Sequence, residues 1–97
     1  MRYDNGQGVL QDYKQAVKWY RKAAEQNNAS AQYNLALMYV KGVGVPKDYV
    51  MAHMYWNIAA VSGAKDAIKN RGLIKKEMTA TQIEKAQDLA RDWVSKH

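Results

Sequence analysis

The side chains best suited to acid–base or metal chemistry are the two histidines of this 97-residue chain, His53 and His97. A histidine acts as a metal ligand or general base when a carboxylate or a second histidine lies within reach, commonly four residues away on a helix. His53 has tyrosine and asparagine at those two positions, and His97 is the last residue. We therefore predict that His53 is a structural side chain, on the surface or half buried, and we expect no metal site.

Other chemistry-bearing residue types also lack the settings that catalysis needs. Ser30 and Ser62 have no G-x-S-x-G surroundings, so we expect them near helix starts and turns. Glu84 and Asp88 form an acidic pair four residues apart, which is typical of a solvated helix surface. The sequence therefore predicts neither a catalytic residue nor a cofactor site, and we expect a protein that is not an enzyme.

A pair of glycines, Gly42 and Gly44, raises the alternative of a phosphate-binding loop. Such a loop follows a strand and continues into G-K-[ST], and neither feature is present here. The pair instead belongs to an internal repeat, because a shift of 36 residues superposes nine identical pairs. They are Tyr3 and Tyr39, Gly6 and Gly42, Gly8 and Gly44, Val9 and Val45, Asp12 and Asp48, Tyr13 and Tyr49, Ala16 and Ala52, Ala23 and Ala59, and Ala24 and Ala60. Periods of about 20 to 50 residues indicate stacked helical units, so we predict an all-α repeat fold.

Apolar residues recur three and four positions apart along much of the chain, which predicts helices. The predicted helices cover residues 12–26, 29–40, 48–61 and 64–73. Asp12 and Asp48 are the expected N-caps of the first and third helices, each following the same glycine-containing turn.

The third predicted helix is apolar on nearly every side. Met51, Met54 and Ile58 stand where its first copy carries glutamine or lysine, so this helix should be buried on two sides. The final segment can supply the cover. Thr79 followed by Gln82 forms a capping-box pattern, and an apolar stripe comes after it. We predict a C-terminal capping helix laid over the last repeat.

A net charge of +6 favours acidic partners. Part of this charge is concentrated in one cluster, made of Lys65, Lys69, Arg71, Lys75 and Lys76. Asp66 and Glu77 interrupt the cluster, and no stacking aromatics accompany it, so nucleic acid is not the expected partner. The cluster is either a solvated face or a patch for an anionic lipid, glycan or nucleic acid, and steep salt dependence would mark the second case.

Composition narrows the class of protein further. Hydrophobic residues make up 47% of the chain and charged residues 25%, which is typical of a single soluble domain. No run of about 18 apolar residues predicts a membrane span. The absence of cysteine excludes disulfides and is compatible with the cytoplasm as well as with a periplasmic or secreted location.

Residues 31–67 carry a specific family pattern. The pattern is A-x-x-N-L-A-x-M-Y-V-K-G-x-G-V-x-x-D, followed by A-x-x-x-W-x-x-A-A and by the segment from Gly63 to Ala67. It closely resembles the Sel1-like repeat, a helix pair related to the tetratricopeptide repeat. The tail from Lys69 to Trp93 resembles the closing segment of many bacterial Sel1-like proteins. The resemblance implies a right-handed α–α solenoid whose members act as adaptors or scaffolds and hold other proteins on a concave surface.

On this basis we expect a single domain in three parts. Residues 1–27 form a partial first repeat, residues 28–63 a complete repeat, and residues 64–97 a last partial repeat with the capping helix. The expected function is a non-enzymatic protein-interaction module that binds a peptide or partner protein on its concave surface. The residues predicted to line that surface are Gln32, Tyr33, Asn34 and Leu37. Tyr33 has packing against the neighbouring repeat as its alternative role.

The first unit begins near the end of its leading helix, so the helix that should precede it is missing. Either the natural protein is longer at this end, or Ala16, Val17, Tyr20 and Ala23 leave apolar surface uncovered. In the second case we expect self-association, as a homodimer through the uncovered first helix or by exchange of segments.

Overall fold

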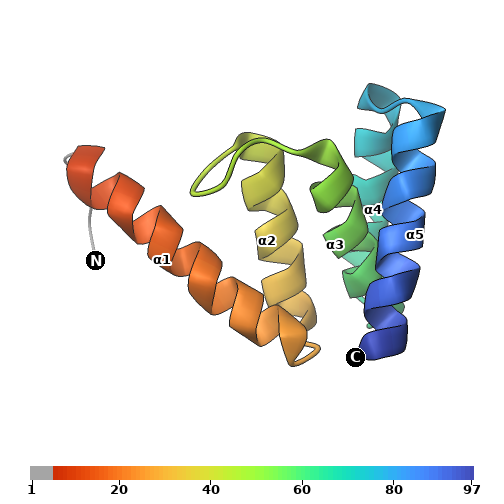
Figure 1. Cartoon of the computed structure of the whole chain (residues 1–97), viewed down its shortest axis with the longest axis horizontal. Helices are drawn as coiled ribbons and strands as arrows, with labels where there is room; N and C mark the ends of the chain where they lie inside the picture. Colours follow the sequence, from red (N-terminus) through yellow and green to blue (C-terminus); the bar gives the residue numbers. More distant parts are fainter. Residues whose placement is uncertain (1–5) are drawn as a thin grey trace.

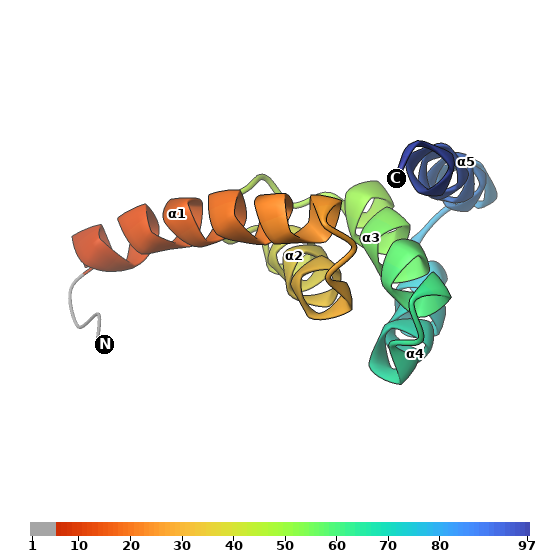
Figure 2. The ribbon, with the colours of Figure 1, turned by 90° about the horizontal axis from the view of Figure 1, so that it is seen from below.

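The computed structural model describes residues 6–97, with side chains from residue 12 onward, as a row of helices. The elements are α1 (Gly6–Glu25), α2 (Ala29–Lys41), α3 (Tyr49–Val61), α4 (Lys65–Ile74), the 3-10 turn η1 (Lys75–Glu77) and α5 (Ala80–Lys96). Consecutive helices pack side by side from α1 to α4, and α5 returns to lie on α3 (Figures 1 and 2). This arrangement confirms the predicted all-α helical repeat solenoid.

Short polar side chains begin three of the helices. Asn28 Oδ1 accepts a hydrogen bond from the Ala31 amide at 2.9 Å, and Asp48 Oδ1 accepts one from Met51 at 3.1 Å. Thr79 forms the predicted capping box, in which the Gln82 amide donates to Thr79 Oγ1 and Gln82 Oε1 accepts from the Thr79 amide. The helix starts predicted near residues 29, 48 and 79 are therefore confirmed, because each depends on a local hydrogen bond.

The turn between α2 and α3 depends on glycine. Gly42 ends α2 with a φ of 68°, and Gly44 has a φ of 75°. Both angles lie in the left-handed region that other residues avoid. Gly44 also lies against α1, where an added Cβ atom would come within 2.7 Å of the Tyr13 carbonyl oxygen. The spacing of the repeat thus brings the turn of one unit onto the helix of the unit before it.

The first copy of this turn does not form. Residues 6–12 belong to α1, so the predicted turn is wrong, and Asp12 lies inside the helix rather than at its N-cap. The second copy contains Pro46, which disfavours helix at the residue before it, whereas the first copy has leucine at the matching position. Glycine alone weakens a helix by only about 1 kcal/mol per residue, which is not enough to break it here.

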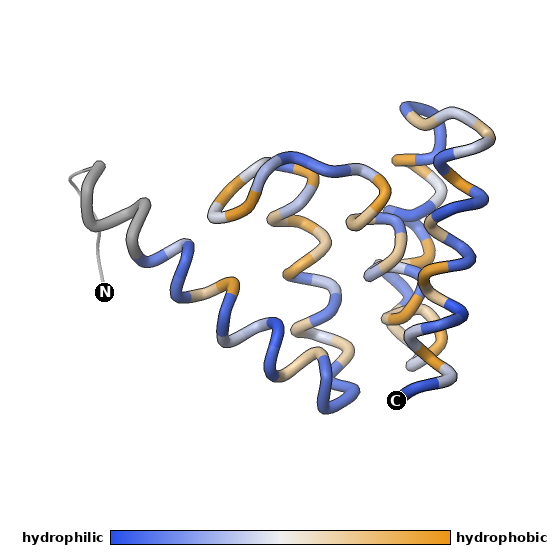
Figure 3. Tube along the Cα trace, in the orientation of Figure 1, coloured by the Kyte–Doolittle hydropathy of each residue, from blue (hydrophilic) through white to orange (hydrophobic). Residues whose placement is uncertain are grey.

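Helix α3 lies at the centre of the fold. It packs against α2, α4 and α5, and apolar positions are frequent along α2 and α3 while α1 is largely hydrophilic (Figure 3). Seven of its side chains are buried, namely Ala52, His53, Met54, Tyr55, Trp56, Ile58 and Ala59. On the facing side, Ala86 and Ala90 of α5 are buried, and their small side chains let the two helices approach closely. The predicted burial of α3 by the C-terminal helix is confirmed.

Helix α1 is the least covered element. It runs obliquely away from the other helices and packs mainly against α2 (Figure 1). Val17 is buried because the turn at Gly44 packs on it, so the alternative of an uncovered apolar surface is wrong for this residue. Trp19 is 67% exposed. Its counterpart Tyr55 is buried by stacking on Tyr39, a residue whose own counterpart, Tyr3, lies outside the described residues.

Across residues 6–97, no helix is both long and apolar enough to cross a membrane.

We predict that Gly44→Ala lowers the free energy of unfolding by about 1–3 kcal/mol, because alanine adds left-handed strain and a clash with Tyr13. Gly63 has a φ of 93°, and an added Cβ atom there would meet no other atom within 4 Å, so Gly63→Ala should lose only the strain component, about 1 kcal/mol. Gly72→Ala, inside α4 with open space around it, should raise stability by up to about 1 kcal/mol. Urea denaturation of the three variants measures their free energies of unfolding, which should rise in the order Gly44→Ala, Gly63→Ala, Gly72→Ala. Equal stability of Gly44→Ala and Gly72→Ala would contradict this account of the turn.

Candidate functional site

Gln32 does not belong to an accessible surface. Its side chain is fully buried, and its Nε2 donates to the Ala24 carbonyl oxygen at 3.1 Å. It therefore ties α2 to α1, and the prediction that it lines a binding surface needs correction on this point. Sequence periodicity alone could not reveal this, because the burial arises from the way α1 crosses α2.

The other three predicted groove residues, Tyr33, Asn34 and Leu37, are half buried on α2. Tyr33 reaches α4, where Asn70 Nδ2 donates to its hydroxyl oxygen at 2.8 Å. Its ring also contacts Trp56 of α3, with 6.1 Å between the ring centroids. Tyr33 thus packs against the neighbouring helices, which was the alternative role, and its role in binding stays a prediction.

Two hollows lie along this surface between α2 and α4. The first, of about 490 Å³, is slightly more polar than apolar and is lined by Ala29, Ser30, Tyr33, Asn34, Ser62, Gly63, Ala64, Lys65 and Asp66. The second, of about 260 Å³, is mostly apolar and is lined by Leu37, Val40, Tyr49, Trp56, Asn70, Leu73, Ile74 and Glu77. Tyr33 lines the first and Asn70 the second, so their hydrogen bond marks the boundary between them. We call the two hollows together the α2–α4 groove.

Leu73 and Trp56 are among the residues of the α2–α4 groove that were not singled out from the sequence as binding residues. Leu73 is 53% exposed. Trp56 is buried, with 3% of its surface exposed, and lines the second hollow. The indole N–H of Trp56 has no hydrogen-bond partner among the described residues. The available signal for Leu73 was an apolar residue near the end of a helix, which equally predicts a core position.

The predicted basic cluster does not form one surface. Lys65 lines the α2–α4 groove, whereas Arg71 turns to the other side of α4 and faces α5. Lys69, Lys75 and Lys76 are exposed. The positive side chains lie on both sides of α4 and on the turn after it. The electrostatic potential at either side is therefore weaker than that of a single patch.

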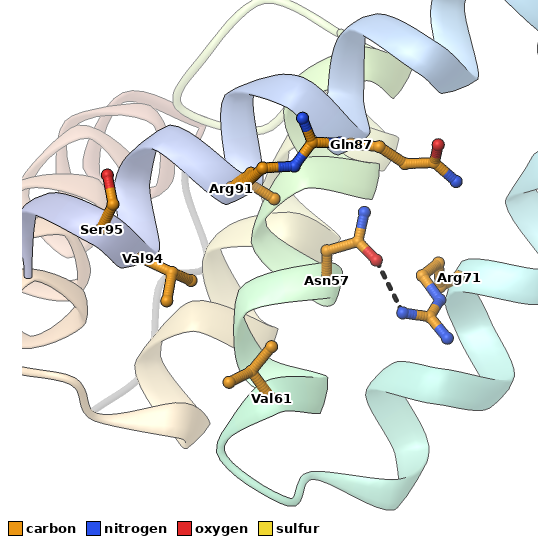
Figure 4. Close-up of a pocket in the computed structure, with 8 residues that line it drawn as sticks. Asn57, Val61, Arg71, Gln87, Arg91, Val94 and Ser95 are labelled. Atoms are coloured by element: carbon orange, nitrogen blue, oxygen red, sulfur yellow. Dashed lines mark hydrogen bonds between the residues drawn. The ribbon is translucent and has the colours of Figure 1, made fainter.

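A third hollow lies on the opposite side of α4, between α3, α4 and α5 (Figure 4). Its volume is about 440 Å³, and its lining residues are Asn57, Val61, Arg71, Gln87, Ala90, Arg91, Val94 and Ser95. We call it the α3–α5 hollow. Figure 4 shows Arg71 of α4 directed at Asn57, and Arg91 of α5 extending along its helix beside Gln87, with Val61 and Val94 facing each other at one end.

A chain of hydrogen bonds leads from Arg71 into the core. Arg71 Nη1 donates to Asn57 Oδ1 at 2.6 Å, and Asn57 Nδ2 lies 2.9 Å from His53 Nδ1. Arginine can only donate, so the Asn57 amide must present its oxygen to Arg71 and its nitrogen to His53. His53 Nδ1 therefore accepts, and the ring is neutral with its proton on Nε2.

His53 is fully buried, so the prediction of a surface or half-buried position is wrong. Burial lowers its pKa to about 4, and the positive charges of Arg71 and Lys75 act in the same direction. Its Nε2 has no hydrogen-bond partner among the described residues. The asparagine four residues after His53 was the one sequence signal for this chain of contacts, while Arg71 lies 14 residues beyond that asparagine.

The stacked helix pairs, the glycine turn and the covering C-terminal helix define a tandem helical-repeat protein. Comparison with protein families gives the same class, because the Sel1 repeat model matches residues 1–28 and 29–63. The chain belongs to the Sel1 repeat family.

Known proteins share this repeat in longer chains. Protein sel-1 homolog 2 of Homo sapiens is 41% identical over 56 residues, which cover 57% of this chain and 8% of the relative. The ERAD-associated E3 ubiquitin-protein ligase component HRD3A of Arabidopsis thaliana is 36% identical over 62 residues, covering 64% of this chain and 9% of the relative. This chain therefore matches less than a tenth of each of these relatives.

A crystal structure with the same fold comes from a protective antigen of uropathogenic Escherichia coli strains, described as displaying an SLR fold. It is 33% identical, with a TM-score of 0.83 over 93% of this chain and 21% of the other chain. Together the relatives indicate a protein-interaction module, in a family typically made of non-enzymatic adaptors. Among the described residues, no group of three or more histidine, cysteine or acidic side chains could hold a metal ion.

The buried His53 predicts a loss of stability in acid. The unfolded chain binds a proton at this residue near pH 6.5 and the folded chain only near pH 4. Between these values the unfolded state binds more protons, so the free energy of unfolding falls as the pH is lowered, by about 3 kcal/mol in total.

Chemical denaturation between pH 7 and pH 4 measures this effect against His53→Gln, which removes the titrating ring. The difference in stability between wild type and His53→Gln should shrink or reverse as the pH falls. His97→Gln is the matched control, because His97 is exposed, and it should follow the wild-type curve. Parallel curves for wild type and His53→Gln would contradict the assignment of a neutral buried ring.

Proposed function

We propose that this chain binds a segment of a partner protein along the α2–α4 groove. The observation that carries the proposal is the joining of an apolar hollow to a polar one across the Tyr33–Asn70 hydrogen bond. A peptide carries apolar side chains next to polar backbone groups, so it matches both halves of such a surface. Tyr33, Asn34 and Leu37 are the contact residues expected from the sequence, and the geometry adds Leu73.

The apolar half would hold the anchoring side chain of the partner. Leu37 is half buried, and Leu73 is 53% exposed, so both have apolar surface that a partner can remove from water. Anchors of this kind dominate binding at small interfaces, with the surrounding contacts excluding water. The groove spans only three short helices, α2, α3 and α4, so we expect modest affinity for an isolated peptide.

The polar half would set the orientation of the partner. Asn34 presents an amide, and Lys65 and Asp66 place opposite charges at the end of the same hollow. Groups of both signs favour a mixed, polar segment over a purely anionic one. The division of the basic cluster between two sides of α4 points the same way, so we favour the groove over an electrostatic site for an anionic lipid, glycan or nucleic acid.

The test starts from peptides selected on the immobilised protein from a random displayed library. We expect Leu73→Ser to weaken the selected peptides about tenfold or more, because it removes a buried apolar contact worth roughly 1.5–3 kcal/mol. Ile68→Ser is the matched control: Ile68 lies on the same helix and is 48% exposed, but it lines none of the three hollows. Isothermal titration calorimetry compares the two variants.

Two outcomes would contradict the proposal. The first is equal weakening by Leu73→Ser and Ile68→Ser, which would place the peptide elsewhere on α4. The second is a steep loss of affinity with added salt, which marks counterion release and an electrostatic site. Groove binding should change little between about 50 and 500 mM salt, because its apolar contacts are not screened.

A further inference from the structure

The α3–α5 hollow is a second concave site, on the side of α4 away from the proposed peptide groove. Two arginines line it, Arg71 from α4 and Arg91 from α5. No carboxylate is part of the lining, and among the described side chains no carboxylate lies within ion-pair distance of Arg71. Arg91 has an exposed pair with Asp88 at 3.3 Å, which is weak because water screens it. The lining of the hollow thus contains two arginines and no carboxylate.

Arg71 is held in position before any ligand arrives. Its Nη1 donates to Asn57 Oδ1, and Asn57 is in turn held by the buried His53. The other N–H groups of its planar fork have no hydrogen-bond partner among the described side chains, and this fork matches the two oxygens of a carboxylate. Because one end of the side chain is already ordered, little further conformational entropy is lost on binding.

The rest of the wall is apolar. Val61 is 72% exposed and Val94 41% exposed, and both line the hollow beside the buried Ala90. Aliphatic side chains left in water at the end of a helix are stabilised when a ligand covers them. Arg91 lies on the same helix as Val94, and Arg71 lies across the hollow on α4, so an anionic group and an aliphatic group can be held next to each other (Figure 4).

Polar groups at the hollow distinguish between ligands that combine these two features. Asn57, Gln87 and Ser95 line it and can exchange hydrogen bonds with peptide amides. A fatty acid would cover these groups with hydrocarbon and leave them unpaired, which is unfavourable. A phosphate group would satisfy the arginines and leave the valines in water. The C-terminal residue of a peptide meets all three requirements when its side chain is aliphatic. Its free α-carboxylate binds the arginines, its side chain covers the valines, and its peptide bond exchanges hydrogen bonds with the polar side chains.

We propose that the α3–α5 hollow binds the C-terminal residue of a partner polypeptide, with its free carboxylate on Arg71 and Arg91 and its aliphatic side chain on Val61 and Val94. The volume of about 440 Å³ lies within the range of sites for small ligands. This site is independent of the α2–α4 groove, and a single partner or two different partners can occupy the two surfaces.

The probe is the peptide acetyl-Ala-Ala-Leu-Val with a free C-terminal carboxylate, and its C-terminal amide is the matched control ligand. Titration followed by amide NMR signals reports both affinity and location. We expect the free acid to shift signals of residues 57–61 and 87–95 and to bind roughly tenfold or more tightly than the amide, since only the acid forms charge-assisted hydrogen bonds.

Four variants test the charged part and the apolar part of the site separately. Arg91→Gln should weaken the free acid roughly tenfold while leaving the weak binding of the amide unchanged. Lys69→Gln removes the same charge from an exposed position on α4 that does not line the hollow, and it should have little effect. Val61→Ser should weaken acid and amide alike. Both Arg91 and Val61 are exposed, so these variants should fold normally, and Arg71→Gln provides a second test of the arginine pair.

Several results would overturn the proposal. Equal affinity for the acid and the amide would exclude recognition of a carboxylate. Equal effects of Arg91→Gln and Lys69→Gln would indicate non-specific charge attraction. Tighter binding of octanoate than of the peptide would assign the hollow to a fatty acid, and no signal change with the free acid at millimolar concentration would show that the hollow takes no such terminus.

Discussion

The burial of α3 on several sides at once is the constraint on which the rest of the structure depends. Its apolar residues require cover from α2, α4 and α5, and no other described helix contacts as many partners. Because α3 lies between its neighbours, consecutive residues face different surfaces: Trp56 lies under the α2–α4 groove, whereas Asn57 lines the α3–α5 hollow. One helix thus supports both candidate sites, and both change if its packing changes.

The sequence was most informative where structure depends on neighbours in the chain. The helix starts at Asn28, Asp48 and Thr79 follow from single side chains that accept backbone hydrogen bonds, and the turn at Gly42 and Gly44 follows from backbone angles. The same local signals misled at residues 6–12, where the glycine spacing is repeated without the proline. The repeated motif therefore predicted the fold correctly, but it did not predict where the first helix begins.

The candidate sites were harder to predict because they join residues that are distant in sequence. Tyr33 and Leu37 could be placed on one face of α2, but their partners Asn70 and Leu73 depend on how α4 crosses the repeat. Helical periodicity shows which residues share a face of a helix, but it does not show which element packs against that face. Gln32 was therefore predicted to be available for binding, although it is buried against α1. The α3–α5 hollow had no sequence signal, since it arises where α5 leaves α4 and packs on α3.

The most direct test of the central role of α3 is native-state hydrogen exchange, resolved by residue. We predict that amides of residues 52–60 exchange most slowly, with a free energy of opening equal to that of global unfolding, because α3 cannot open unless three neighbours separate from it. We also predict that α5 and α3 lose protection together. Slower exchange in α1 or α2 than in α3, or a state in which α5 is open while α3 remains fully protected, would contradict the central role of α3.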